Sequence, residues 1–151
     1  MTNIVRVEQY CSDGRIKLHS RAGGWSIYAA FVEHAGGQGL VRIGVSTAPL
    51  QKLHALQCGS DYAVGAALWT HVGNRSQAMR MEKALKRRFA ARRIDDDWFS
   101  FDLSSPQDKT EFHSACRAAY ARATGELLQW RKASSEQMRI ADELTREGLR
   151  A

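Results

Sequence analysis

Two short apolar runs on either side of a glycine-rich loop constrain this chain more than any other feature. The runs cover residues 25–32 and 40–45, and the loop between them holds three glycines. Alternating apolar residues bounded by glycine predict two antiparallel strands joined as a hairpin. A third apolar run over 63–72 predicts a further core strand in the same sheet.

Capping and periodicity signals place helices between and after these strands. Thr47 is a candidate N-cap, and Gly59 can end the helix that it begins. The apolar spacing over 75–92 is that of an amphipathic helix. Residues 95–103 predict a turn into a short strand, and Ser105 opens another helix.

Composition divides the chain into three parts. Residues 1–24 predict an N-terminal hairpin and a joint, with Asp13-Gly14 as its turn. Residues 25–103 predict the central domain. Residues 104–151 predict a C-terminal helical extension that packs on the domain, on a partner or on a second copy. The expected fold class is therefore α/β of the α+β kind, with a small central sheet of about three core strands flanked by helices.

Each of the first two core strands carries one residue that is unusual in a plain core strand. Side-chain parity places Ser26, Tyr28 and Ala30 on one face, and Arg42 and Gly44 share a face of the next strand. A phenol and a guanidinium beside small residues would leave room for a ligand. The alternative is an ordinary half-buried tyrosine and an arginine that points into solvent.

Helix 75–92 carries a carboxylate beside its apolar stripe. At about 100° per residue, Glu82 falls near the edge of that stripe. A carboxylate there is costly unless it is paired or binds a cation. Two interpretations stay open, an ion pair with Lys86 four residues on and a metal ligand. The stripe consists of Ala78, Met81, Leu85 and Phe89.

The charge favours a polyanionic partner. The chain has 22 Lys+Arg against 16 Asp+Glu, which gives a net charge of +6, and nucleic acid is the commonest partner of such proteins. No stretch approaches the roughly 20 apolar residues of a membrane span, and the three cysteines have no paired spacing. We therefore expect a cytoplasmic protein without a membrane partner.

The order of five short motifs resembles the GIY-YIG nuclease superfamily, nearest its phage and bacterial branch with a basic-Ile-Gly second motif. The resemblance covers 25–103, roughly half of the chain. The motifs are "SIY" at 26–28, "RIG" at 42–44, "APLQKL" at 48–53, "MEKALKRRF" at 81–89 and "DWFSF" at 97–101.

This resemblance implies a DNA endonuclease that hydrolyses phosphodiester bonds with one divalent ion, Mg²⁺ or Mn²⁺. It implies that Tyr28 assists proton removal from the attacking water, that Glu82 holds the metal, and that the backbone at Gly44 approaches the site. Arg42 and Lys52 would stabilise charge on the phosphoryl oxygens.

The sequence also departs from that family. Arg42 stands at the second tyrosine, Lys52 at the expected arginine, and Lys86 where a histidine often follows. Lysine neutralises a phosphate but offers no bidentate fork. The alternative function is therefore a degenerate domain of that fold, which binds nucleic acid or regulates a partner without cutting.

A basic run follows the same helix. Lys86, Arg87, Arg88 and Arg92 are candidates to track phosphates, and a solvated helix face is the alternative. The acidic run at 95–97 is interpreted as a solvated turn rather than a metal site.

Overall fold

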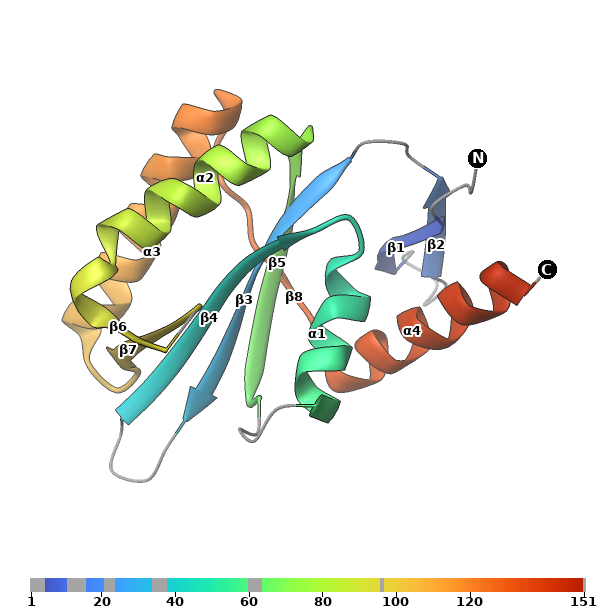
Figure 1. Ribbon diagram of the computed structural model, residues 1–151, viewed down its shortest axis with the longest axis horizontal. Coiled ribbons are helices and arrows are strands. Elements are labelled where there is room, and N and C mark those ends of the chain that lie inside the picture. Colours follow the sequence, from blue (N-terminus) through green and yellow to red (C-terminus); the bar gives the residue numbers. More distant parts are fainter. Residues whose placement is uncertain are drawn as a thin grey trace.

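The expected strands lie side by side at the centre of one sheet. In the computed structural model, which describes residues 5–10, 16–20, 24–33, 38–59, 64–95 and 97–150, six strands pair antiparallel in the order β6-β7-β4-β3-β5-β8 (Figure 1). The strands of this sheet are β3 (Trp25–Glu33), β4 (Gln38–Ser46), β5 (Ala66–Gly73), β6 (Arg93–Asp95), β7 (Trp98–Asp102) and β8 (Arg131–Lys132). The helices are α1 (Pro49–Gly59), α2 (Arg75–Arg88), α3 (Pro106–Thr124) and α4 (Ser135–Arg150), with a short 3-10 turn η1 (Ala90–Arg92).

The mixed α+β class is confirmed, but the expected number of about three strands is too small. The predicted core strands are β4, β3 and β5, and the short strand predicted after residue 95 is β7. The additional edge strands β6 and β8 have three and two residues, all of them exposed. Strands this short and solvated carry no apolar alternation, so periodicity does not reveal them.

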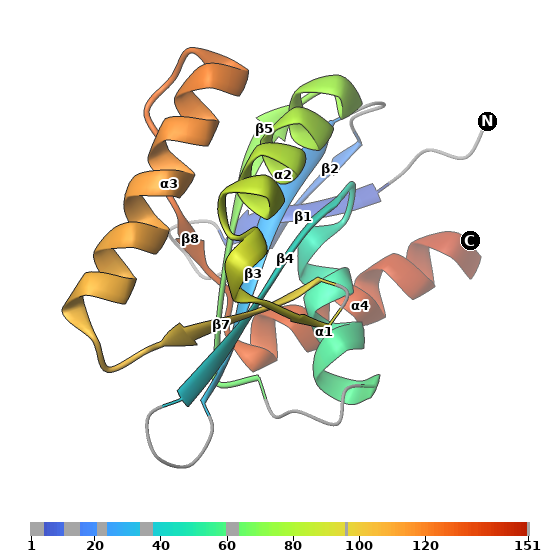
Figure 2. The ribbon, with the colours of Figure 1, turned by 60° about the vertical axis from the view of Figure 1, so that its left-hand side comes forward.

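The parity prediction places two different cores on the two faces of the sheet. Ile27 and Ala29 pack with α2 and α3, whereas Tyr28 and Ala30 pack with α1 and α4. Figure 2 shows the two helix pairs on opposite sides of the sheet.

The predicted N-terminal hairpin is present as a separate two-stranded sheet of β1 (Val5–Tyr10) and β2 (Ile16–Ser20). Its predicted turn at 13–14 lies outside the described residues.

Local capping explains where α2 and α3 begin. Asn74 and Gln77 form a capping box at the start of α2. Ser105 caps α3 with Pro106 in its first turn, and Gly125 ends α3 in the left-handed conformation at φ 75°. The boundary expected between residues 103 and 104 falls between β7 and α3. Buried residues of α3 pack in the same core as α2.

No helix in the described part of the chain is long and apolar enough to cross a membrane.

Phe89 joins α2 to the rest of this core. Its ring is fully buried and packs against Phe99, Phe101 and Phe112. Phe101 and Phe112 also contact each other edge to face. The helix that carries the candidate carboxylate is therefore fixed on the sheet by an aromatic cluster.

Replacing Phe89 by alanine should lower the free energy of unfolding by about 3–5 kcal/mol, because it removes a buried aromatic side chain and leaves a cavity. Urea denaturation at neutral pH measures this loss. The matched control is Met79→Ala on the same helix, where the side chain is 41% exposed, and the change should stay within about 0.5 kcal/mol. Equal effects of the two variants would contradict the role given to Phe89.

Candidate functional site

The candidate site lies at the end of β4 where β7 no longer pairs with it. In the described residues β7 pairs with β4 only from Gln38 to Arg42. Residues 43–46 therefore pair with β3 on one side and have no strand on the other. Helix α2 packs against β4 and brings Glu82 and Lys86 to this region. The site is thus built from β3, β4, α2 and the turn before β7.

Tyr28 and Gly44 face each other across the β3–β4 pair. They are direct partners in the antiparallel register, and the Tyr28 ring lies over the glycine. A Cβ at position 44 would overlap the Tyr28 hydroxyl. Gly44 therefore makes room for the phenol, which is almost fully buried.

Arg42 connects the phenol to an acidic side chain. It donates a hydrogen bond to the Tyr28 hydroxyl, and its Nη2 lies 3.5 Å from Oδ2 of Asp97. The guanidinium also lies over the Trp98 ring, 5.8 Å from its centroid. Its Nε is buried and has no hydrogen-bond partner among the described residues. An unsatisfied charged donor of this kind suits an anionic oxygen.

Lys86 links Asp97 to Glu82. Its Nζ lies 2.6 Å from Oδ1 of Asp97 and 3.3 Å from Oε1 of Glu82. Burial opposes the charge on Lys86, but the hydrogen bond to Asp97 and the charge of Glu82 outweigh it and raise the pKa of the ammonium. The ion pair between Glu82 and Lys86 that the sequence suggested is thus present. It belongs to a larger network that also includes Asp97.

Tyr28 is held in its neutral form. Burial raises the pKa of the phenol above its ordinary value, the hydrogen bond and charge of Arg42 lower it, and the negative charges of Asp97 and Glu82 raise it further. The net shift is upward, so the phenol keeps its proton at neutral pH. Because a guanidinium only donates, Tyr28 accepts from Arg42 and its own proton is left for another acceptor.

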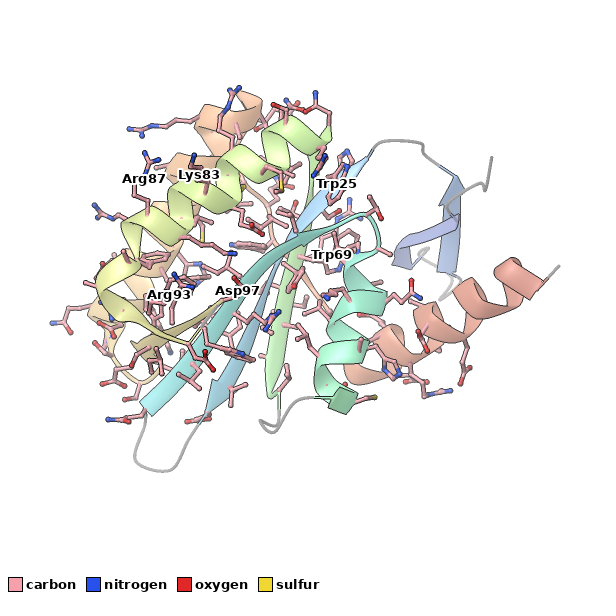
Figure 3. All side chains as sticks on the ribbon, viewed as in Figure 1. Trp25, Trp69, Lys83, Arg87, Arg93 and Asp97 are labelled. Carbon is pink, nitrogen blue, oxygen red and sulfur yellow. The ribbon has the colours of Figure 1, made fainter. Side chains whose placement is uncertain are left out.

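The structure does not connect every predicted site residue to this network. Lys52 lies exposed on α1, and among the described residues no ion pair joins it to Tyr28, Arg42 or Glu82. Figure 3 shows Asp97 beside β4, beneath α2, with Lys83 and Arg87 on the outer side of that helix.

Arg92 has a structural role instead of the predicted phosphate contact. Its guanidinium lies 3.1 Å from Asp108 and 2.7 Å from Glu111, donates to the backbone oxygen of Ser100, and covers the Phe101 ring. Both Nη atoms of Arg92 are engaged, so Arg92 is left out of the candidate interface. Arg87 and Arg88 are exposed on α2.

Sequence reasoning missed Asp97. The acidic run predicts a solvated turn, and Asp95 is exposed, whereas Asp97 contacts both Arg42 and Lys86. Its contact with Arg42 follows from its position directly before Trp98, which is the register partner of Arg42. That pairing depends on tertiary structure and is not visible from spacing.

The comparison with protein families identifies the domain. The family model of the T5orf172 domain matches residues 26–118, more than half of the chain. The chain belongs to the T5orf172 domain family. No curated protein and no solved structure matches it.

The expected membership of the GIY-YIG superfamily is wrong, because the matching model is that of the T5orf172 domain. The motifs behind that expectation are strand segments of three to five residues and short helix patterns. Such motifs indicate an order of strands and helices rather than one family. The T5orf172 match contains every residue of the network and most of α3, while β1, β2 and α4 lie outside it.

Removing Arg42 should raise the pKa of Tyr28 further. Arg42→Gln abolishes a charge that favours the phenolate, and burial together with Asp97 and Glu82 remains. Alkaline titration followed by NMR of the tyrosine ring carbons measures the shift, with Tyr28→Phe to assign the signal. Arg139→Gln, on α4, is the matched control and should leave the titration unchanged. A fall in the Tyr28 pKa would contradict the contact.

The Arg92 cluster should stabilise the protein at neutral pH and not in acid. The backbone N–H of Asp102 and the Arg92 guanidinium hold the pKa of Asp108 below its usual value. This stabilisation is complete above about pH 4 and is lost as pH falls through the lowered pKa. Asp108→Asn should therefore cost about 1–2 kcal/mol at pH 7 and much less in strong acid. Urea midpoints at the two pH values test this, with exposed Glu136→Gln as control, and an equal loss at both would contradict it.

Proposed function

We propose that this T5orf172 domain is a metal-dependent endonuclease that hydrolyses phosphodiester bonds of DNA. One observation carries the proposal, the convergence of a phenol, a guanidinium and two carboxylates at the open part of the β4 edge. These groups are Tyr28, Arg42, Glu82 and Asp97. The net charge of +6 supports a polyanionic substrate.

The donor set fits a divalent cation of the Mg²⁺ type. Such an ion keeps several waters and needs one or two carboxylates together with substrate phosphates. No group of three or more His, Cys, Asp or Glu residues in the described part of the chain is arranged to hold a metal, but Glu82 and Asp97 already share one cation, the Lys86 ammonium. When bound, the ion would lower the pKa of a water and polarise the phosphate.

The protein's own groups then have distinct tasks. Arg42, whose side chain is 22% exposed, would use its guanidinium to stabilise charge on a phosphate oxygen. Neutral Tyr28 would donate its remaining proton to an oxygen of the substrate, because its raised pKa opposes the phenolate. Tyr28 therefore acts here as a donor and not as the base that the resemblance implied.

A second function, DNA binding without cleavage, is favoured by one observation. Lys86 forms ion pairs with both carboxylates, and a lysine that occupies the position between them would let the domain bind a strand without hydrolysing it. The two functions differ in whether Glu82 is needed for turnover.

Glu82→Gln should abolish cleavage and leave DNA binding intact or slightly tighter, because it removes the metal ligand and one repulsive charge. Supercoiled, linear and branched DNA are incubated with Mg²⁺ or Mn²⁺, and binding is measured separately in chelator. Asp97→Asn should slow cleavage as well. The matched control is Glu136→Gln, an exposed carboxylate on α4.

Wild-type cleavage that Glu82→Gln does not slow would contradict the role of Glu82 as ligand. Wild-type protein that binds DNA and cuts none of the substrates would contradict the nuclease function and support the second one. Thermal unfolding of each variant separates lost chemistry from lost folding.

A further inference from the structure

A groove runs between α2 and α3, away from the candidate site. Its volume is about 460 Å³. Its floor consists mainly of alanine side chains from both helices, and Leu85 beneath them is almost fully buried. Three arginines line it, Arg80 and Arg88 from α2 and Arg122 from α3.

The positive charge at this groove is not balanced within the described residues. Arg80, Arg88 and Arg122 are exposed and form no ion pair there. The carboxylates of the two helices are engaged elsewhere, Glu82 with Lys86, and Asp108 and Glu111 with Arg92. An anionic partner would therefore meet unpaired guanidinium groups.

The groove is continuous with the candidate site around the outside of α2. At about 100° per residue, Lys86 lies closest to Glu82 and Lys83 follows further round the helix, and Arg80 lies within about 20° of Arg87. Arg80 and Arg88 line the groove. Figure 3 shows Lys83 and Arg87 on the outer side of the helix, away from Asp97. One band of positive charge thus leads from the network at Asp97 to the groove.

We propose that the α2–α3 groove holds the sugar-phosphate backbone of the DNA that flanks the scissile segment. This inference rests on the proposed DNA-directed function. Arg80 and Arg88 are eight residues apart, about 12 Å along the helix axis, which is more than the axial advance of about 3.4 Å per phosphate of a strand. The two arginines would therefore meet different phosphates of one strand, with Arg122 on the opposite wall.

The floor favours a nucleic-acid backbone over an acidic protein. Protein interfaces take most of their affinity from large anchors that fill apolar pockets, and this floor offers alanine methyl groups. Phosphate binding needs charge and close approach, and small side chains between exposed arginines provide both.

The test is the salt dependence of DNA binding, measured without divalent metal so that no cleavage occurs. A short labelled duplex is titrated with wild type and with Arg80→Gln/Arg122→Gln, and log Kd is plotted against log salt. The slope should become shallower by about 0.9 for each lost phosphate contact. The control Lys132→Gln/Arg139→Gln removes the same charge from β8 and α4 and should keep the wild-type slope.

Equal slopes for the two double variants would overturn the groove assignment, because only net charge would then matter. Protein that binds polyglutamate through Arg80 and Arg122 but binds no duplex would also overturn it and assign the groove to an acidic protein. A shallower slope in the groove variant supports the inference even if wild type cuts no DNA, and thermal unfolding confirms that both variants fold.

Discussion

The register of β3 on β4 is the constraint on which the site depends. It sets Tyr28 opposite Gly44 and Ala30 opposite Arg42, so that the phenol and the guanidinium share one face. A slip by one residue would exchange the faces of the shifted strand and turn its polar side chain, Tyr28 or Arg42, into the apolar core beneath α2 and α3. Ile27, Ala29 and Ile43 are buried in that core. Because side chains alternate between the two faces of a strand, their burial also determines which residues lie on the polar face.

A second constraint is electrostatic. The ammonium of Lys86 holds Glu82 and Asp97 near each other, and Asp97 in turn engages Arg42. Two carboxylates beside a half-buried network would repel each other without a cation between them. In the proposed function, Lys86 is therefore the group that a divalent ion would have to displace.

Helix α2 separates the candidate site from the groove that we propose for DNA. Its side toward β4 carries Glu82 and Lys86, its buried side holds the helix on the sheet, and its far side contributes Arg80 and Arg88 to the groove with α3. The capping box at Asn74 and the packing of Phe89 define the two ends of this helix. Movement of α2 would therefore alter the site and the basic band together.

Alternation and capping signals in the sequence were enough to predict the central strands, their two faces and the helices, because these depend on contacts between near neighbours in the chain. They also singled out Tyr28, Arg42 and Glu82. Asp97, Arg92 and Lys52 were decided by tertiary structure alone. A turn brings Asp97 to Arg42, α3 supplies the carboxylates that engage Arg92, and Lys52 is exposed on α1 without an ion pair to the network among the described residues. Charged side chains far apart in sequence obey no local periodicity, so only the packed fold determines which of them meet.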